Sequence, residues 1–120
     1  MKNIFLIITA LLIASTVFAQ APNKMTYQSV IRDASSNLVT TQSVGIRISI
    51  MQTSPTGTAV YVETHTPTTN ANGLATIEIG GGSVVSGTMA SIDWSAGPYY
   101  LKTETDPAGG TTYTITGTSQ

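Results

Sequence analysis

The clearest pattern in this chain is a regular alternation of apolar and polar positions near its middle. The apolar residues at every second position are Val44, Ile46, Ile48 and Ile50. Because successive side chains of a strand point to opposite faces, this period of two predicts a strand with one buried face. The residues Ser-Pro-Thr-Gly at 54–57 are typical of a turn and mark its end.

Further short strands follow from the same kind of pattern. We expect them over residues 26–33, 58–66, 74–79, 99–105 and 111–116, with a short apolar segment at 38–39. Asn72-Gly73 suits the positive φ of a tight turn, and residues 106–110 suit a hairpin connection. About seven short strands, with a turn roughly every 8–12 residues, predict an all-β fold that is a single antiparallel β-sandwich.

The alternation also assigns the faces of the strand at 58–66. We expect Val60 and Val62 to point inward, and Tyr61, Glu63 and His65 to point outward to solvent. Residues 83–97 are the least regular stretch of the chain, and no strand is predicted there.

The first nineteen residues have the features of a cleaved secretory signal peptide. Lys2 gives a positive start, residues 4–13 form an apolar run, and small residues precede a cleavage position after Ala19. The run is shorter than the about 20 residues that a membrane-spanning helix needs. We therefore expect an exported chain without a membrane span, in which residues 20–25 lead into a β-sandwich domain at 26–120.

The composition fits an exported all-β domain and argues against several other classes. The chain has no cysteine, so we expect neither disulfides nor a lipoprotein anchor. Five basic residues against six acidic ones give a net charge of −1, which provides no basic footprint for nucleic acid. Nineteen threonines follow Ala19, and this β-branched residue favours strands.

Four stretches of the chain together resemble a known module. They are residues 27–33 (YQSVIRD), 44–50 (VGIRISI), 63–74 (ETHTPTTNANGL) and 92–106, which begins with Ile92-Asp93-Trp94. Over its whole mature length the chain is similar to the N-terminal β-sandwich module of Bacteroidetes secreted and cell-surface proteins, which are often tail-fibre-like or collagen-like. This resemblance implies an immunoglobulin- or transthyretin-like sandwich outside the cell, and it transfers no catalytic residue.

The C-terminal end departs from that module. There the run Gly117-Thr118-Ser119-Gln120 normally continues into an apolar strand resembling L-x-S-V-P-Y-A. We expect either a truncated domain that lacks its last strand or one that naturally ends a strand short. Both would leave a strand edge open to pairing with another chain. The residues expected to form this strand-edge interaction are Thr112, Tyr113, Thr114, Ile115 and Thr116.

The sequence predicts no catalytic, cofactor-binding or metal site. His65 is the single histidine, no Ser or Thr stands in a nucleophile-elbow context, and one His without Cys does not supply a zinc site. A glycosidase pair would need two carboxylates on either side of a cleft. We expect the acidic residues to be outward charges on strands instead: Glu63, Glu78, Glu104 and Asp106.

These observations predict a non-enzymatic structural or interaction module that is secreted, extracellular or at the cell surface, with the periplasm left open. Its expected partners are other protein chains or further domains of the same protein. The alternative is a small carbohydrate-binding module in which Trp94 and Tyr100 contact a glycan. Alternation places Tyr99 and Tyr100 on opposite faces, so only part of this aromatic set is expected to be exposed.

Overall fold

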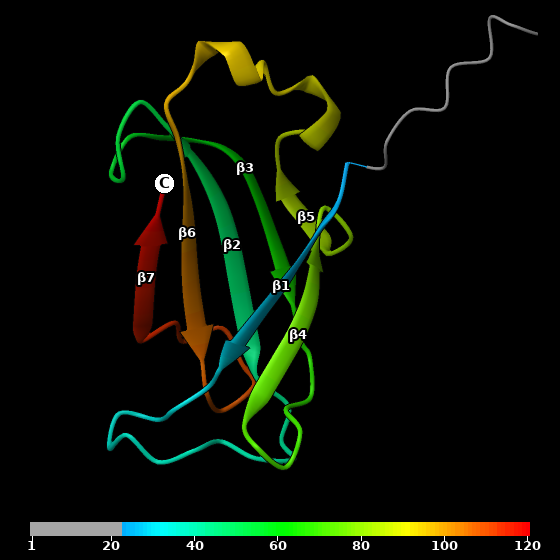
Figure 1. Cartoon of the computed structure of the whole chain (residues 1–120), viewed down its shortest axis with the longest axis vertical. Helices are drawn as coiled ribbons and strands as arrows, with labels where there is room; N and C mark the ends of the chain where they lie inside the picture. Colours follow the sequence, from blue (N-terminus) through cyan, green and yellow to red (C-terminus); the bar gives the residue numbers. More distant parts are fainter. Residues whose placement is uncertain (1–22) are drawn as a thin grey trace, which may run out of the picture.

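The computed structural model describes residues 23–120, so the expected signal peptide and its cleavage position lie outside the described residues. Within 23–120 the fold is all-β, with seven antiparallel strands in two sheets (Figure 1). The strands are β1 (Met25–Val30), β2 (Gly45–Gln52), β3 (Thr58–His65), β4 (Leu74–Ile79), β5 (Ser83–Ser86), β6 (Tyr99–Asp106) and β7 (Ile115–Ser119). The all-β class and the number of strands agree with the prediction, but the short segment expected at 38–39 is not a strand, and β5 is a strand that was not predicted.

The two sheets are of unequal width. The larger one has the order β5-β3-β2-β6-β7, and the smaller one consists of β1 and β4. Figure 1 shows β1 and β4 lying across one face of the larger sheet, in front of β2 and β3. Two strands therefore cover a five-stranded sheet, and part of the inner face of the larger sheet is left without a strand above it.

The core lies between the two sheets. The inner face of β2 carries Ile46, Ile48 and Ile50, which are all buried as predicted, whereas Ser49 and Met51 on the opposite face are also buried, so the prediction of a single buried face is wrong. The apolar partners of the three isoleucines on β4 are Ala75, Ile77 and Ile79. Burying a side chain of this size stabilises the fold by about 1.5–3 kcal/mol. The core is completed by Ile31, Val39 and Val44, with Tyr27, Met89 and Leu101 packed against it.

The turn before β4 forms as its sequence predicts. Gly73 has a φ of +76°, a backbone conformation that glycine adopts without strain. The Asn70 side chain accepts hydrogen bonds from the backbone N–H groups of Asn72 (2.8 Å) and Leu74 (3.0 Å). An asparagine that bonds the backbone two residues on is a common way of fixing a turn.

The faces predicted for β3 are wrong. Tyr61 and Glu63 were expected to point to solvent, but they are 1% and 0% exposed. Val60 and Val62, expected to be inward, are both half-buried, and His65 is also mostly buried with 11% of its side chain exposed. The reason is that the polar groups of Tyr61, Glu63 and His65 bond to one another, so that they can be buried without losing hydrogen bonds.

The region between β4 and β7 also differs from expectation. The stretch at 83–97 was expected to be irregular, but it contains β5 and two short 3-10 turns, η1 (Met89–Ser91) and η2 (Trp94–Ala96). β5 has no alternating pattern, because all four of its residues are exposed. The last strand was expected at 111–116 and instead begins at Ile115. Residues 111–114 belong to the connection from β6.

Candidate interaction surfaces

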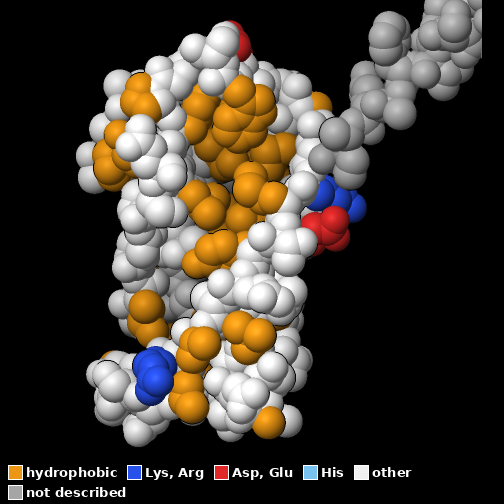
Figure 2. Space-filling view, viewed as in Figure 1, with side chains coloured by type: hydrophobic (Ala, Val, Ile, Leu, Met, Phe, Trp, Pro, Cys, Tyr) orange, Lys and Arg blue, Asp and Glu red, His pale blue; other side chains and the backbone are white. Residues whose placement is uncertain are grey.

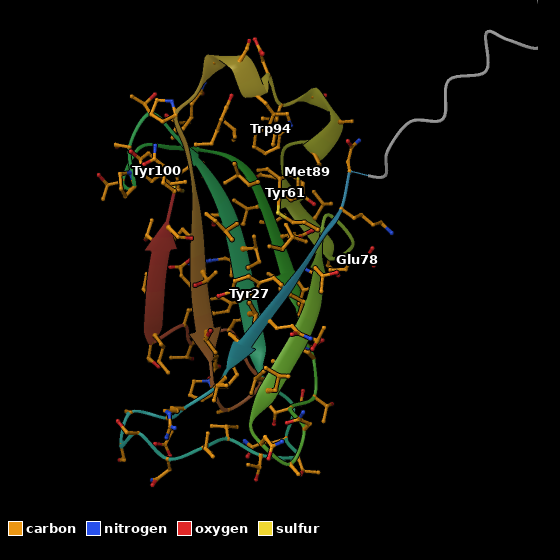
Figure 3. All side chains as sticks on the ribbon, in the orientation of Figure 1. Tyr27, Tyr61, Glu78, Met89, Trp94 and Tyr100 are labelled. Carbon is orange, nitrogen blue, oxygen red and sulfur yellow. The ribbon has the colours of Figure 1, made fainter. Side chains whose placement is uncertain are left out.

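The mismatch between the sheets opens a cleft of about 180 Å³ beside β1. One wall is β1 with its continuation to Arg32, and the other is the inner face of β6 and β7. The large apolar hollow that Figure 2 shows lies nearer η1 and η2, where Figure 3 labels Trp94, Met89 and Tyr61, and is not this cleft. The residues that line the cleft are Tyr27, Ser29, Val30, Ile31, Arg32, Ile46, Thr103, Thr105, Ile115, Thr116 and Gly117. Arg32 is the only charged residue among them.

Strand edges border this cleft on both sides. Within residues 23–120, β1 pairs with β4 alone and β7 pairs with β6 alone. A strand with one neighbour directs about half of its backbone N–H and C=O groups away from the sheet. Four of the five residues of β7 are exposed, and Val30 at the end of β1 is 53% exposed. These two edges can accept hydrogen bonds from, and donate them to, another extended chain.

The predicted strand-edge residues do not all lie on an edge. Ile115 and Thr116 belong to β7, whereas Thr112, Tyr113 and Thr114 precede it. Tyr113 packs elsewhere, because the Arg47 guanidinium lies 4.6 Å from the centre of its ring. The structure therefore places the β7 edge at Ile115–Ser119, a few residues later than the sequence predicts.

Arg47 and Tyr113 belong to a second polar site, on the outer face of the larger sheet. Arg47 Nε donates to Glu104 Oε2 at 2.7 Å, and Lys102 Nζ lies 3.3 Å from Glu104 Oε1. The hydrogen bond from Arg47 holds the pKa of Glu104 below its ordinary value, and in turn raises the pKa of Arg47. Beside this ion pair a groove of about 470 Å³ includes Met51 and apolar side chains of β3 and β5.

The aromatic residues predicted for glycan binding are not brought together. Trp94 is 52% exposed, and its ring meets that of Tyr99 edge to face with the centroids 5.1 Å apart. Tyr99 Oη also donates to the backbone carbonyl of Asp93, 2.5 Å away, which fixes the Tyr99 ring beside η2. Tyr100 is half-buried on the opposite face of β6 (Figure 3). Trp94 and Tyr100 therefore do not form one continuous platform.

The most strongly bonded side chain that the sequence reasoning missed is Glu63. Tyr61 Oη donates to its Oε2 at 2.7 Å, and His65 Nε2 lies 2.9 Å from its Oε1. The backbone N–H groups of Gly80 and Gly82 donate to it at 2.8 and 3.1 Å. Glu63 thereby ties β3 to the glycine-rich connection between β4 and β5. The available sequence signal was the spacing Tyr-x-Glu-x-His on one strand face.

These contacts also determine how Glu63 and Tyr61 titrate. Burial raises the pKa of the Glu63 carboxyl, but the hydrogen bonds from His65, Tyr61 and the two glycines lower it more, so its pKa is below the ordinary value. Burial, and then the adjacent Glu63 carboxylate, raise the pKa of Tyr61 to about 12. The carboxylate is therefore ionised and the phenol neutral at pH 7.

Three of the four acidic residues that were expected to be solvent-facing charges are buried, although Glu104 does lie on the outer face of its strand. Glu63 is fully buried, Glu104 is 8% and Asp106 5% exposed, and Glu78 alone is exposed. Asp106 is buried because it accepts hydrogen bonds from the backbone N–H groups of Ala108 and Thr112. Glu63 and Glu104 lie on opposite faces of the larger sheet, so these two carboxylates cannot flank the same glycosidic bond.

Among residues 23–120 no group of three or more His, Cys, Asp or Glu side chains is placed to hold a metal ion. No helix in the same range is long and apolar enough to cross a membrane.

The architecture defines the class of protein: an all-β domain of seven antiparallel strands in two sheets. Residues 26–118 match the family model described as "Domain of unknown function (DUF8740)", and the chain belongs to that family. The match begins in β1 and ends in β7, so it includes all seven strands. No curated protein and no solved structure matches the chain.

Proposed function

We propose that this chain is a non-enzymatic structural or interaction module, exported to the cell surface or beyond, that acts by pairing a strand edge with another protein chain or another domain of its own protein. Its fold is then a β-sandwich of immunoglobulin or transthyretin type with one side open. The observation that carries this proposal is the β7 edge, where Ile115–Ser119 has one strand neighbour and is almost entirely exposed.

Two further features support an interaction role. Charged side chains commonly protect strand edges against pairing, and β7 has none along Ile-Thr-Gly-Thr-Ser. The buried acidic side chains have their hydrogen-bonding capacity used within the fold, as in Glu63 with its four partners. Such side chains stabilise the scaffold and leave the edges to make contacts.

Photo-crosslinking tests this proposal. The chain has no cysteine, so a single Thr118→Cys substitution places one benzophenone label on β7. Thr76→Cys on the exposed face of β4 is the matched control. In the producing cell we expect a defined adduct from position 118, with a polypeptide that also binds the purified domain. Equal labelling from both positions, or an adduct whose partner does not bind again, contradicts the proposal.

The exposed Trp94 ring supports a second candidate, a carbohydrate-binding module. Trp94 is the only tryptophan, so its fluorescence reports on this position alone. A glycan that stacks on the ring changes this fluorescence in a saturable way, and Trp94→Ala then loses glycan binding while the far-UV spectrum is unchanged. A set of glycans that leaves the emission unchanged removes this candidate.

A further inference from the structure

The smaller sheet ends beside an open cleft, and this position would suit a further strand. β1 pairs through one edge with β4, from Met25↔Ile79 to Val30↔Leu74, and its other edge borders the cleft. Tyr27 and Ser29 point from β1 toward the larger sheet and are only half-buried. Across the cleft, Ile115 and Gly117 of β7 line the opposite wall.

We propose that an extended segment of a separate polypeptide enters this cleft and pairs with the free edge of β1 as a third strand of the smaller sheet. The inference rests on the proposed function and specifies a second edge and its partner. β1 has six residues, and a strand rises about 3.3 Å per residue, so the cleft suits a segment of about six to eight residues. Alternate side chains of that segment point onto the core.

The cleft determines the chemistry of the segment. Its walls present methyl groups, hydroxyl groups and one aromatic ring, from Tyr27, Thr103, Thr105 and Ile115 among others. A charged side chain facing these walls would lose its hydration without gaining an ion pair. The inward positions of the segment are therefore apolar, and the outward positions, which face solvent, are polar.

Arg32 adds a requirement for charge and direction. It lies just beyond β1 at the end of the cleft, and it makes no ion pair within the described residues. Its Nη1 donates to the Ser36 carbonyl at 2.8 Å, which leaves other guanidinium donors for a carboxylate. If the segment runs antiparallel to β1, as β4 does, its N-terminal end reaches Arg32. An acidic residue is expected there.

A second copy of this chain fits the cleft less well. The described strands with an open edge are already held in their own sheets, and β7 offers only Ile115 as an apolar residue among its five. A segment from a separate polypeptide avoids both problems, since it needs no rearrangement of either sheet and can carry an apolar residue at every second position.

The test uses a fluorescent peptide of about eight residues. It carries Val at alternate positions, Thr or Ser between them, and Glu at its N-terminus. Two control peptides have the same composition, one with the valines consecutive and one with the Glu at the C-terminus. Anisotropy titrations of the chain from residue 20 measure each Kd. We expect the alternating peptide to bind at least about ten-fold tighter than the peptide with consecutive valines.

Matched variants locate the binding. Ser29→Lys places an ammonium group in the cleft, whereas Gln28→Lys places the same charge on the other face of β1. We expect about ten-fold weaker binding from the first variant and less than two-fold change from the second. Arg32→Gln should remove the roughly three-fold preference for the N-terminal Glu peptide over the C-terminal one. Circular dichroism and thermal unfolding verify that each variant is folded.

Three outcomes overturn the proposal. The first is equal binding of the alternating peptide and the consecutive-valine peptide, and the second is unchanged peptide binding by a folded Ser29→Lys variant. The third is a dimer of the chain, seen by light scattering, that the peptide dissociates, because a second copy would then be the occupant of the cleft. If any of these outcomes is found while a label at position 118 still cross-links a defined partner, binding of a segment in the cleft is rejected and the proposal for the β7 edge stands.

Discussion

The prediction that the structure defines best concerns Glu63, the buried carboxylate on β3. Glu63→Ala removes the acceptor for the Tyr61 hydroxyl and for the backbone N–H groups of Gly80 and Gly82. Glu63 is 0% exposed, so water does not replace the carboxylate without rearrangement of the connection between β4 and β5. Gly82 has little room to adjust, because a Cβ there would lie 2.5 Å from His65 Nε2.

The magnitude follows from the donors that lose their acceptor. Each buried donor without a partner costs about 1–3 kcal/mol. Removing one member of a buried charged network costs about 3–5 kcal/mol in total. We therefore expect Glu63→Ala to lower the free energy of unfolding by about 3–5 kcal/mol, a large part of the about 5–15 kcal/mol that holds a domain folded. In Glu63→Gln, one of the two glycine backbone N–H groups faces the new amide NH₂ instead of an oxygen, and we expect the free energy of unfolding to fall by about 1–2 kcal/mol.

The assay is urea unfolding at pH 7, followed by far-UV circular dichroism. The matched control is Glu78→Ala, since Glu78 is an exposed carboxylate on the neighbouring β4, and we expect it to change stability by less than about 0.5 kcal/mol. If Glu63→Ala costs no more than Glu78→Ala at an unchanged m-value, the carboxylate does not hold β3 to the β4–β5 connection.

Three other predictions follow from named contacts. The pKa values of Glu63 and Glu104 are lowered in the folded chain, so the two carboxylates stabilise the fold above a pH of about 4.3, and this stabilisation is lost as the pH falls. Glu63→Gln and Glu104→Gln should each make the free energy of unfolding depend less steeply on pH in the acid range. An unchanged slope of stability against pH contradicts this. Burial and Glu63 raise the pKa of Tyr61 to about 12, so the neutral phenol stabilises the fold below a pH of about 10, and this stabilisation is lost as the pH rises toward about 12. In a pH titration followed by ultraviolet difference absorbance, one tyrosine should ionise after the others, and Tyr61→Phe should remove that last step. A Cβ on Gly45 would collide with the Gly110 carbonyl oxygen, so Gly45→Ala should lower the free energy of unfolding in urea by about 1–3 kcal/mol. A decrease below about 0.5 kcal/mol would show that the β6–β7 connection moves aside easily.

The sequence predicts well those elements whose side chains follow simple alternation. β2 and β4 present Ile46, Ile48, Ala75 and Ile77 to one core, and burial of these apolar groups dominates the local choice of face. On β6, Lys102 and Glu104 share one face, as alternation predicts, although Glu104 is buried by its partner Arg47.

Elements that depend on polar pairing are not visible in such a pattern. By alternation alone, Tyr61 and Glu63 are expected to face solvent. They can be buried because each satisfies the other's hydrogen-bonding group. The start of β7 is shifted because Tyr113 packs on Arg47 before the strand begins. The open cleft depends on how many strands join each sheet, and no local pattern in β1 determines that number.

The most direct test of edge pairing is hydrogen–deuterium exchange on a chain that starts at residue 20, followed amide by amide with and without the alternating peptide. The account predicts fast exchange at alternate amides of β1 in the free chain, and at least about ten-fold slower exchange there when the peptide is bound. The amides of β4 should not change. Protection of every β1 amide before the peptide is added, or no change after it, would contradict pairing at the β1 edge.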